Sequence, residues 1–128
     1  MSSIFSKIIA GEIPCHRIAE DENYLAFLDI QPLVPGHVLV IPKIEVDYIF
    51  NCEDELLAGL ILFAKKVAKM MEGKFDCKRI GVSVIGLEVP HTHIHLIPIN
   101  GVNDMDFSRE KMTPSKNELE QIAELIRG

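Results

Sequence analysis

The chain has no tryptophan and only three cysteines among its 128 residues. These cysteines, Cys15, Cys52 and Cys77, are far apart and form no Cys-x-x-Cys pair, which argues against a disulfide framework and against a cysteine zinc site. The N-terminal segment is interrupted by Lys7 and Glu12 and lacks the pattern of a signal peptide. We therefore expect a protein of the reducing cytoplasm.

Positive charge and long apolar runs are also scarce. The formal net charge is −6, and no cluster of lysines and arginines occurs. Proteins that bind the backbone of DNA or RNA usually present a basic stripe, so we expect no nucleic-acid partner. No stretch approaches the roughly 18–20 consecutive apolar residues of a membrane-spanning helix, so we expect no membrane partner. The length predicts one globular domain over residues 1–128.

Hydrophobic spacing predicts three helices and five strands. The helices are expected at residues 3–10, about 53–72 and 116–127, and Ser115 and Glu118 have the spacing of a capping box for the last one. The strands are expected at about residues 15–19, 24–29, 37–42, 79–85 and 91–99. Residues 100–114 are polar and predicted to be irregular. This order predicts an α+β fold with a mostly antiparallel sheet of about five strands, one long helix and two shorter helices.

Three histidines at alternate positions, His91, His93 and His95, are the feature that points to chemistry. The chain has only five histidines, and three of them fall within this short stretch. On a strand, residues i, i+2 and i+4 share one face. The three imidazoles are therefore expected to form a row, while Thr92 and Ile94 point into the core.

The residues alone leave three interpretations of this row open. In the first, an imidazole that donates one N–H to a carbonyl keeps a lone pair on its other nitrogen and attacks a phosphorus atom. His93 has a neighbour on both sides and is the natural nucleophile, with His91 and His95 in support. In the second, two of the histidines share a zinc ion, although no Cys, Asp or Glu cluster completes such a site. In the third, the histidines lie on a solvated sheet face without a chemical role.

The row and its surroundings resemble the histidine triad (HIT) family of nucleotide-binding proteins, whose motif is His-x-His-x-His followed by apolar residues. Here the motif occupies residues 91–97, and similar stretches occur at residues 4–14, 26–32 and 35–43. The resemblance implies a HIT-like fold and a homodimer with the long helix at its interface. It also implies hydrolysis or transfer at the α-phosphate of a nucleotide conjugate, of the nucleoside phosphoramidate or dinucleoside polyphosphate type. The reaction would pass through a nucleotidyl-histidine intermediate on His93.

The resemblance also implies how a purine nucleotide would be held. Asp29 would accept hydrogen bonds from the ribose hydroxyls. Three apolar residues would form the walls of the base pocket, namely Ile13, Phe27 and Ile30. The segment before the triad and the preceding strand would surround the phosphate, with Ser83, Gly86, Glu88 and Val89.

The segment before the triad departs from the family pattern. Many members carry a Gly-Gln pair or a hydroxyl residue there, which binds phosphate, whereas this chain has Leu87 and Glu88. The Leu87 side chain has no donor, and an ionised Glu88 would repel a phosphate. A nucleotide-binding module with little catalysis is therefore the alternative function.

The N-terminal segment departs from the zinc-bearing members of the family. Ser3 and Ser6 stand where those members have cysteines, and Glu45 stands where some members have another histidine. We therefore expect no metal and no cofactor.

Overall fold

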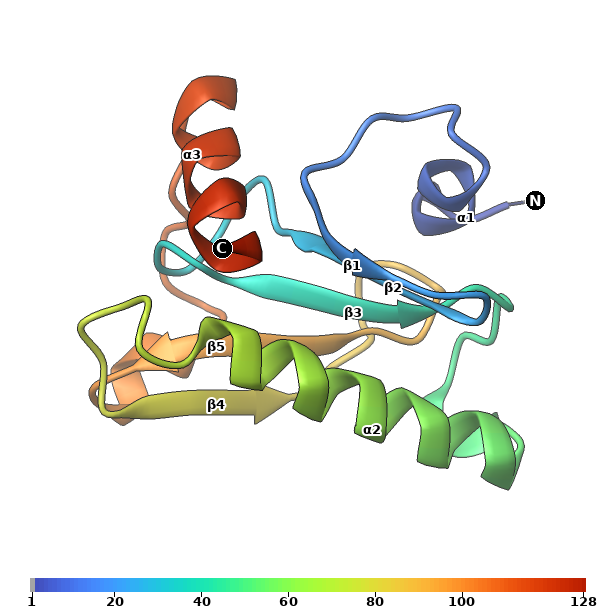
Figure 1. The fold of residues 1–128 in the computed structure, drawn as a ribbon. Coiled ribbons are helices and arrows are strands. Elements are labelled where there is room, and N and C mark those ends of the chain that lie inside the picture. Colours follow the sequence, from blue (N-terminus) through green and yellow to red (C-terminus); the bar gives the residue numbers. More distant parts are fainter. Residues whose placement is uncertain (1) are drawn as a thin grey trace.

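The computed structural model describes residues 2–128 and contains one five-stranded antiparallel sheet with the strand order β1-β2-β3-β5-β4 (Figure 1). The strands are Arg17–Glu20 (β1), Tyr24–Leu28 (β2), Val38–Pro42 (β3), Arg79–Ser83 (β4) and Ile94–Ile99 (β5). The helices are Ile4–Ile9 (α1), Asp54–Met71 (α2) and Lys116–Arg127 (α3), and short 3₁₀ turns cover Ile49–Asn51 (η1) and Val102–Met105 (η2). The predicted α+β fold, with its one long and two shorter helices, is confirmed.

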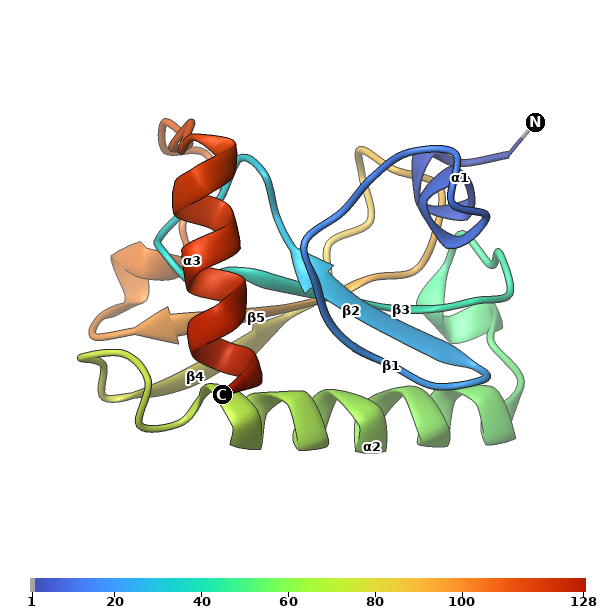
Figure 2. The same ribbon diagram turned by 45° about the horizontal axis from the view of Figure 1, so that its top comes forward.

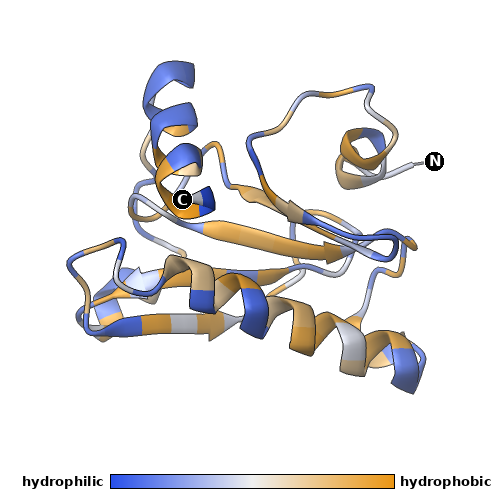
Figure 3. Cartoon of the chain, in the orientation of Figure 1, coloured by the Kyte–Doolittle hydropathy of each residue, from blue (hydrophilic) through white to orange (hydrophobic). Residues whose placement is uncertain are grey.

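The main core lies between one face of the sheet and the helices α2 and α3. Alternate residues of the two central strands point into it, among them Val38 and Val40 of β3 and Ile94 and Leu96 of β5. The C-terminal end of α3 lies beside the C-terminal end of α2 (Figure 2). Figure 3 shows the apolar colouring concentrated on the central strands, whereas much of α3 is hydrophilic. Among the described residues, no helix has both the length and the apolarity needed to cross a bilayer.

The opposite face of the sheet carries a smaller apolar cluster beneath α1. Phe5 of α1 packs there against Phe27 of β2, together with Leu39 and Ile41 of β3. The strand alternation places His95 on this face, because its neighbours Ile94 and Leu96 belong to the main core. The helix α1 and the histidines therefore share one side of the sheet.

The strand β5 begins at Ile94 and not at His91, so the prediction of a strand over residues 91–99 is wrong at its start. His91 and His93 belong to an irregular connection, residues 84–93. This connection also includes residues 84 and 85, which the sequence predicted as the end of the fourth strand. Pro90 has no N–H for a strand ladder, and Gly86 turns the chain at a φ of 79°. The N–H and the hydroxyl of Thr92 both donate to the carbonyl of Val46, at 2.6 Å each, instead of to a neighbouring strand.

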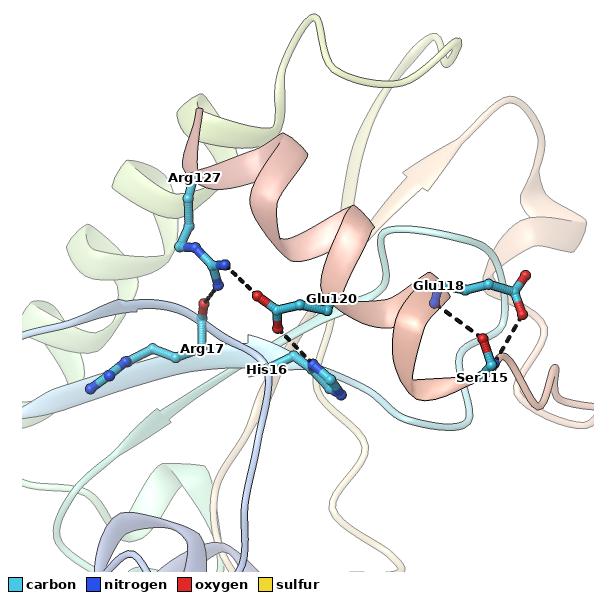
Figure 4. A network of polar contacts seen from close by, with 6 residues as sticks. All are labelled: His16, Arg17, Ser115, Glu118, Glu120 and Arg127. Atoms are coloured by element: carbon cyan, nitrogen blue, oxygen red, sulfur yellow. Dashed lines mark hydrogen bonds and ion pairs between the residues drawn. The ribbon is translucent and has the colours of Figure 1, made fainter.

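The helix α3 is tied to the sheet at its end and capped at its start (Figure 4). The predicted capping box is confirmed, because the Glu118 N–H donates to Ser115 Oγ and the Ser115 N–H donates to Glu118 Oε1. The Arg127 guanidinium donates to the Arg17 carbonyl at 2.5 Å and to Glu120 Oε2 at 2.7 Å. This anchoring holds α3 against β1.

Candidate active site

A cavity of about 480 Å³ opens on the sheet face beneath α1, and it contains most of the predicted site residues. The residues that line it include His93, His95, Asp29, Ile30, Gly86, Glu88 and Val89. Four predicted residues do not line it, namely His91, Ile13, Phe27 and Ser83. The structure therefore brings two of the three histidines, the carboxylate and the loop before the triad to one place.

The hydrogen bonds of His93 determine which of its nitrogens is free. Nδ1 lies 2.7 Å from the carbonyl oxygen of His91, so Nδ1 carries the proton and donates it there. Nε2 then holds the lone pair, and it makes no hydrogen bond. Because no buried side-chain nitrogen or oxygen of the described residues lacks a partner, Nε2 is accessible, and His93 lines the cavity. The Phe5 ring meets the imidazole edge-on, with centroids 5.1 Å apart, and fixes its orientation.

His95 is oriented in turn by His37, at the start of β3. The Leu33 N–H donates to His37 Nδ1 at 3.1 Å, so His37 carries its proton on Nε2. That Nε2–H donates to His95 Nδ1 at 2.9 Å, which leaves the proton of His95 on Nε2, toward the cavity. Burial lowers the pKa of His37 to about 4 and that of His95 to about 3, so both rings are neutral at pH 7.

His91 is sealed behind the cavity and both of its nitrogens are engaged. Its Nε2–H donates to the Pro42 carbonyl at 2.8 Å, and its Nδ1 accepts from the Ser3 hydroxyl at 2.9 Å. The Ser6 hydroxyl and the Ser3 N–H both donate to Glu45 Oε1, and these bonds lower the pKa of Glu45 to about 2. The network fastens α1 above the triad. Its hydroxyls and its carboxylate do not fit a zinc site of the cysteine and histidine type.

Asp29 lies at the end of β2, and its side chain is 21% exposed. Its Oδ1 accepts the Gln31 N–H at 2.9 Å, and burial raises its pKa. Ligand atoms of Asp29, His37 and His95 lie within 4.8 Å of one another, a spacing that suits a metal ion. The facing nitrogens of the two histidines, however, are already used in the hydrogen bond between them. The geometry therefore favours a hydrogen-bond chain over a metal centre.

The row of histidines is not a solvated surface feature. His91 is 0%, His93 6% and His95 7% exposed, and each ring makes at least one hydrogen bond. Burying three imidazoles is costly unless their polar atoms are hydrogen-bonded or reach solvent, and no polar side-chain atom of the described residues is both buried and unpartnered. The remaining open nitrogens, Nε2 of His93 and Nε2 of His95, offer one lone pair and one N–H to the same cavity. This pair of groups suits attack on an electrophile whose negative oxygen needs a donor.

Acid is expected to destabilise the fold through His37 and His95. Their pKa values in the fold, about 4 and about 3, lie below the value of 6.5 that applies to the unfolded chain. Between pH 6.5 and 4 the unfolded state therefore binds more protons than the folded state. The two histidines contribute their whole stabilisation above pH 6.5, and the free energy of unfolding decreases as the pH falls below that value. Each histidine contributes about 1.4 kcal/mol per pH unit in this window. Thermal unfolding followed by circular dichroism from about pH 7.5 to about pH 5 measures the effect.

The variant His37→Asn is the control for this pH dependence. It removes one of the two depressed imidazoles, so its melting temperature should fall less steeply with acid than that of the wild-type chain. An identical slope in the two proteins would show that the buried pair does not control acid stability.

The sequence pattern missed several residues that line the cavity. Ile4 and Leu39 were expected only as parts of a helix and a strand, and residues 107–111 were expected to be irregular. The Pro-Gly-His sequence before β3 is the one local signal for His37, because a histidine at a strand start after a turn is suited to a structural hydrogen bond, and His37 accepts one from the Leu33 N–H. Nothing in the spacing of residues 100–114 predicts that they reach the triad.

The chain is similar to known proteins in both sequence and fold. The family described as HIT domain matches residues 10–101. The adenosine 5'-monophosphoramidase of Schizosaccharomyces pombe is 39% identical over 99 residues, which cover 77% of this chain and 74% of that protein. The protein called "Protein hit" in Bacillus subtilis is 39% identical over 108 residues, 79% of this chain and 73% of that protein. A HIT-like protein of Bartonella henselae has a crystal structure that matches at a TM-score of 0.84 and 35% identity, over 98% of this chain and 95% of that one. Matched over most of its length, this chain belongs to the histidine triad family, the HIT domain proteins.

Proposed function

We propose that the protein is a nucleotide hydrolase or transferase that acts at the α-phosphate of a nucleoside phosphoramidate or dinucleoside polyphosphate. The observation that carries the proposal is the 2.7 Å hydrogen bond from His93 Nδ1 to the His91 carbonyl, which leaves a lone pair on Nε2 at the cavity. The name of the Schizosaccharomyces pombe relative, adenosine 5'-monophosphoramidase, supports an adenine nucleotide as the first substrate to test.

The chemistry divides into two displacements at phosphorus. In the first, the Nε2 lone pair of His93 forms a bond to the α-phosphorus while the P–N or P–O bond of the leaving group breaks. The leaving group departs with that electron pair and takes up a proton from water. In the second, a water oxygen bonds to the phosphorus and releases a proton to solvent, while the bond between phosphorus and Nε2 breaks and its electron pair returns to Nε2. The Nε2–H of His95 donates to a phosphate oxygen in both steps.

The nucleoside would lie in the part of the cavity near Asp29. The Asp29 carboxylate is partly exposed there and accepts hydrogen bonds from the ribose hydroxyls in our proposal. Apolar side chains in the same wall, Ile30 and Leu39, cover a purine face. Phe27 supports this wall through the cluster that it shares with Leu39, and Ile13 is not part of the cavity lining.

Incubation with adenosine 5'-phosphoramidate tests the proposed function directly. We expect AMP to accumulate catalytically, measured by liquid chromatography, and the corresponding 2'-deoxy compound to be a poorer substrate because it offers Asp29 one hydroxyl fewer. Equal rates with the two compounds would remove the role given to Asp29.

The second candidate function is a nucleotide-binding module with little catalysis. It is favoured by Leu87, which is 88% exposed at the cavity and has no donor, and by the Glu88 carboxylate in the same loop. Saturable binding of AMP without formation of product above background would select this function over the enzyme.

We further propose that the protein is a cytoplasmic homodimer. Three free cysteines accord with a reducing compartment. The edge strand β4 and the neighbouring helix α2 expose apolar side chains, with Val82 57%, Ile61 49% and Leu62 64% exposed (Figure 1). Exposed apolar side chains on an edge strand and a helix are typical of an interface.

The oligomeric state is tested by light scattering during size-exclusion chromatography. The wild-type chain is expected at the mass of a dimer, and the variant Leu62→Glu at the mass of a monomer, because a buried charge at the interface is costly. Leu125→Glu is the matched control, since Leu125 is 46% exposed on α3, away from β4. A monomeric wild-type protein contradicts the proposal.

A further inference from the structure

The segment between β5 and α3 lies over the histidines although the HIT family match ends at residue 101. The Phe107 ring meets the His95 ring at a centroid distance of 4.7 Å and the His37 ring at 6.2 Å. Further along, the Met112 N–H donates to the Pro32 carbonyl at 2.9 Å. Two separate contacts thus hold this segment at the rim of the cavity, and Ser108 and Lys111 between them line it.

The charges in the cavity do not suit a phosphate unless Lys111 takes part. Two carboxylates line the cavity, Asp29 and Glu88, and both repel an anion. His37 and His95 are neutral at pH 7. Among the described residues that line the cavity, Lys111 is the one side chain with a permanent positive charge. The loop before the triad adds no side-chain donor at Leu87, so the phosphate has few other partners.

The present partner of Lys111 is Glu88. Lys111 Nζ lies 3.6 Å from Glu88 Oε1, and the two side chains are 31% and 81% exposed. They come from two different segments, the connection 84–93 and the C-terminal segment, so the ion pair joins two parts of the cavity wall. An ion pair this exposed is weak, so the ammonium group is able to exchange it for a phosphate.

The position of Lys111 also places its charge within reach of the deeper groups. Burial is the main influence on the pKa of Asp29, which it raises, and on that of His95, which it lowers. The positive charge of Lys111 lowers the pKa of both groups as well. The positive charge of Lys111 is therefore felt both at Asp29, in the nucleoside pocket, and at His95, in the triad.

We propose that Lys111 is a substrate-binding residue whose ammonium group contacts the phosphate of the bound nucleotide, with Glu88 as its counter-ion when no nucleotide is present. The proposal rests on the proposed function and deepens it, because it requires a substrate with an anionic phosphate oxygen beside the scissile bond. It also gives Glu88 a role that accords with phosphate binding: the carboxylate is paired with Lys111 and mostly exposed to solvent.

Calorimetric titration with AMP and with adenosine separates the phosphate contact from the nucleoside contacts. Lys111→Met is expected to weaken AMP binding about 10- to 100-fold, the range of a charge-assisted hydrogen bond, and to leave adenosine binding unchanged. Lys111→Arg should retain AMP binding, and Glu88→Gln should strengthen it, since the ammonium group loses its competitor. Lys116→Met is the matched control, because Lys116 is exposed at the start of α3 and does not line the cavity.

Three outcomes would overturn the proposal. If Lys111→Met binds AMP as the wild type does, Lys111 does not contact phosphate, and the proposed function stands without it. If Lys111→Met loses AMP and adenosine affinity equally, Lys111 supports the shape of the cavity only. If the wild-type protein binds no AMP and cleaves no adenosine phosphoramidate, the proposed function itself fails, and this inference fails with it. If Lys111→Met folds poorly, Glu88→Gln still tests the phosphate contact, because it removes the competitor of the ammonium group and leaves Lys111 in place. Unchanged AMP binding in Glu88→Gln would then contradict the proposal.

Discussion

Replacing His93 with alanine is expected to lower the turnover of adenosine 5'-phosphoramidate by at least about 10⁴-fold, the order seen when a nucleophile is removed. No other imidazole of the triad is able to take its place. His91 has both nitrogens engaged and is fully buried. His95 accepts a hydrogen bond on Nδ1 and presents an N–H, not a lone pair, to the cavity. The loss should appear in kcat, because the side chain acts in the chemical step.

The covalent intermediate gives a second, independent readout for His93. Quenching the wild-type reaction in denaturing base and measuring intact mass should reveal a population heavier by one adenylyl group, with fragmentation placing it on His93. His93→Ala should show no such adduct while its circular dichroism spectrum stays that of the wild type. His16→Ala is the matched control, since His16 contacts Glu120 and not the cavity, and it should keep full turnover. Full turnover in folded His93→Ala would exclude the mechanism.

Replacing His37 with leucine is expected to reduce kcat by about 10²- to 10³-fold, the range for loss of one preorganised donor. His37 does not have to touch the substrate to have this effect. Its Nε2–H is the donor that holds the proton of His95 on Nε2. Without that donor, His95 is free to carry its proton on Nδ1 and to present a lone pair to the phosphate oxygen, which repels it. Because the cavity wall beside Asp29 is kept, the change in KM should be small.

Two measurements separate this effect from a loss of folding. The variant His37→Leu also leaves the Leu33 N–H without its acceptor, which costs about 1–3 kcal/mol, so its melting temperature must be recorded alongside its activity. Nitrogen NMR of the His95 ring reports the tautomer directly. His37→Asn provides an amide N–H in place of the imidazole and should retain more activity than His37→Leu. An unchanged kcat together with an unchanged His95 tautomer in His37→Leu would contradict the role given to His37.

The sequence predicted most helices and strands because their signals are local. The capping box at Ser115 and Glu118 is a contact between residues three positions apart, and it is present as predicted. The alternation holds within β5, where Ile94 and Leu96 belong to the main core and His95 between them lines the cavity. The boundaries were less accurate where a single residue changes the backbone, as Pro90 does before β5.

The predictions for the nucleoside and phosphate residues were only partly correct, because local sequence signals do not identify which residues line a cavity. Asp29, Ile30, Gly86, Glu88 and Val89 line the cavity, but Ile13, Phe27 and Ser83 do not. Phe27 is 3% exposed and packs edge-on against Phe5, a partner 22 positions away in the chain that no periodicity identifies. Which side of a strand faces a cavity follows from alternation, whereas which residues cover that side depends on segments that arrive from elsewhere.

The sequence by itself determined the family, because the triad motif and the stretches around it are residue types at fixed spacings. Only the tertiary structure decided how each imidazole is oriented and on which nitrogen it carries its proton. The proton positions of His93 and His95 follow from the His91 carbonyl and from His37, and His37 is far from the triad in sequence. The arrival of Lys111 at the cavity likewise depends on the docking of Phe107 and on the anchoring of α3. Proton position and local charge are properties of neighbours in space, and a linear pattern does not contain them.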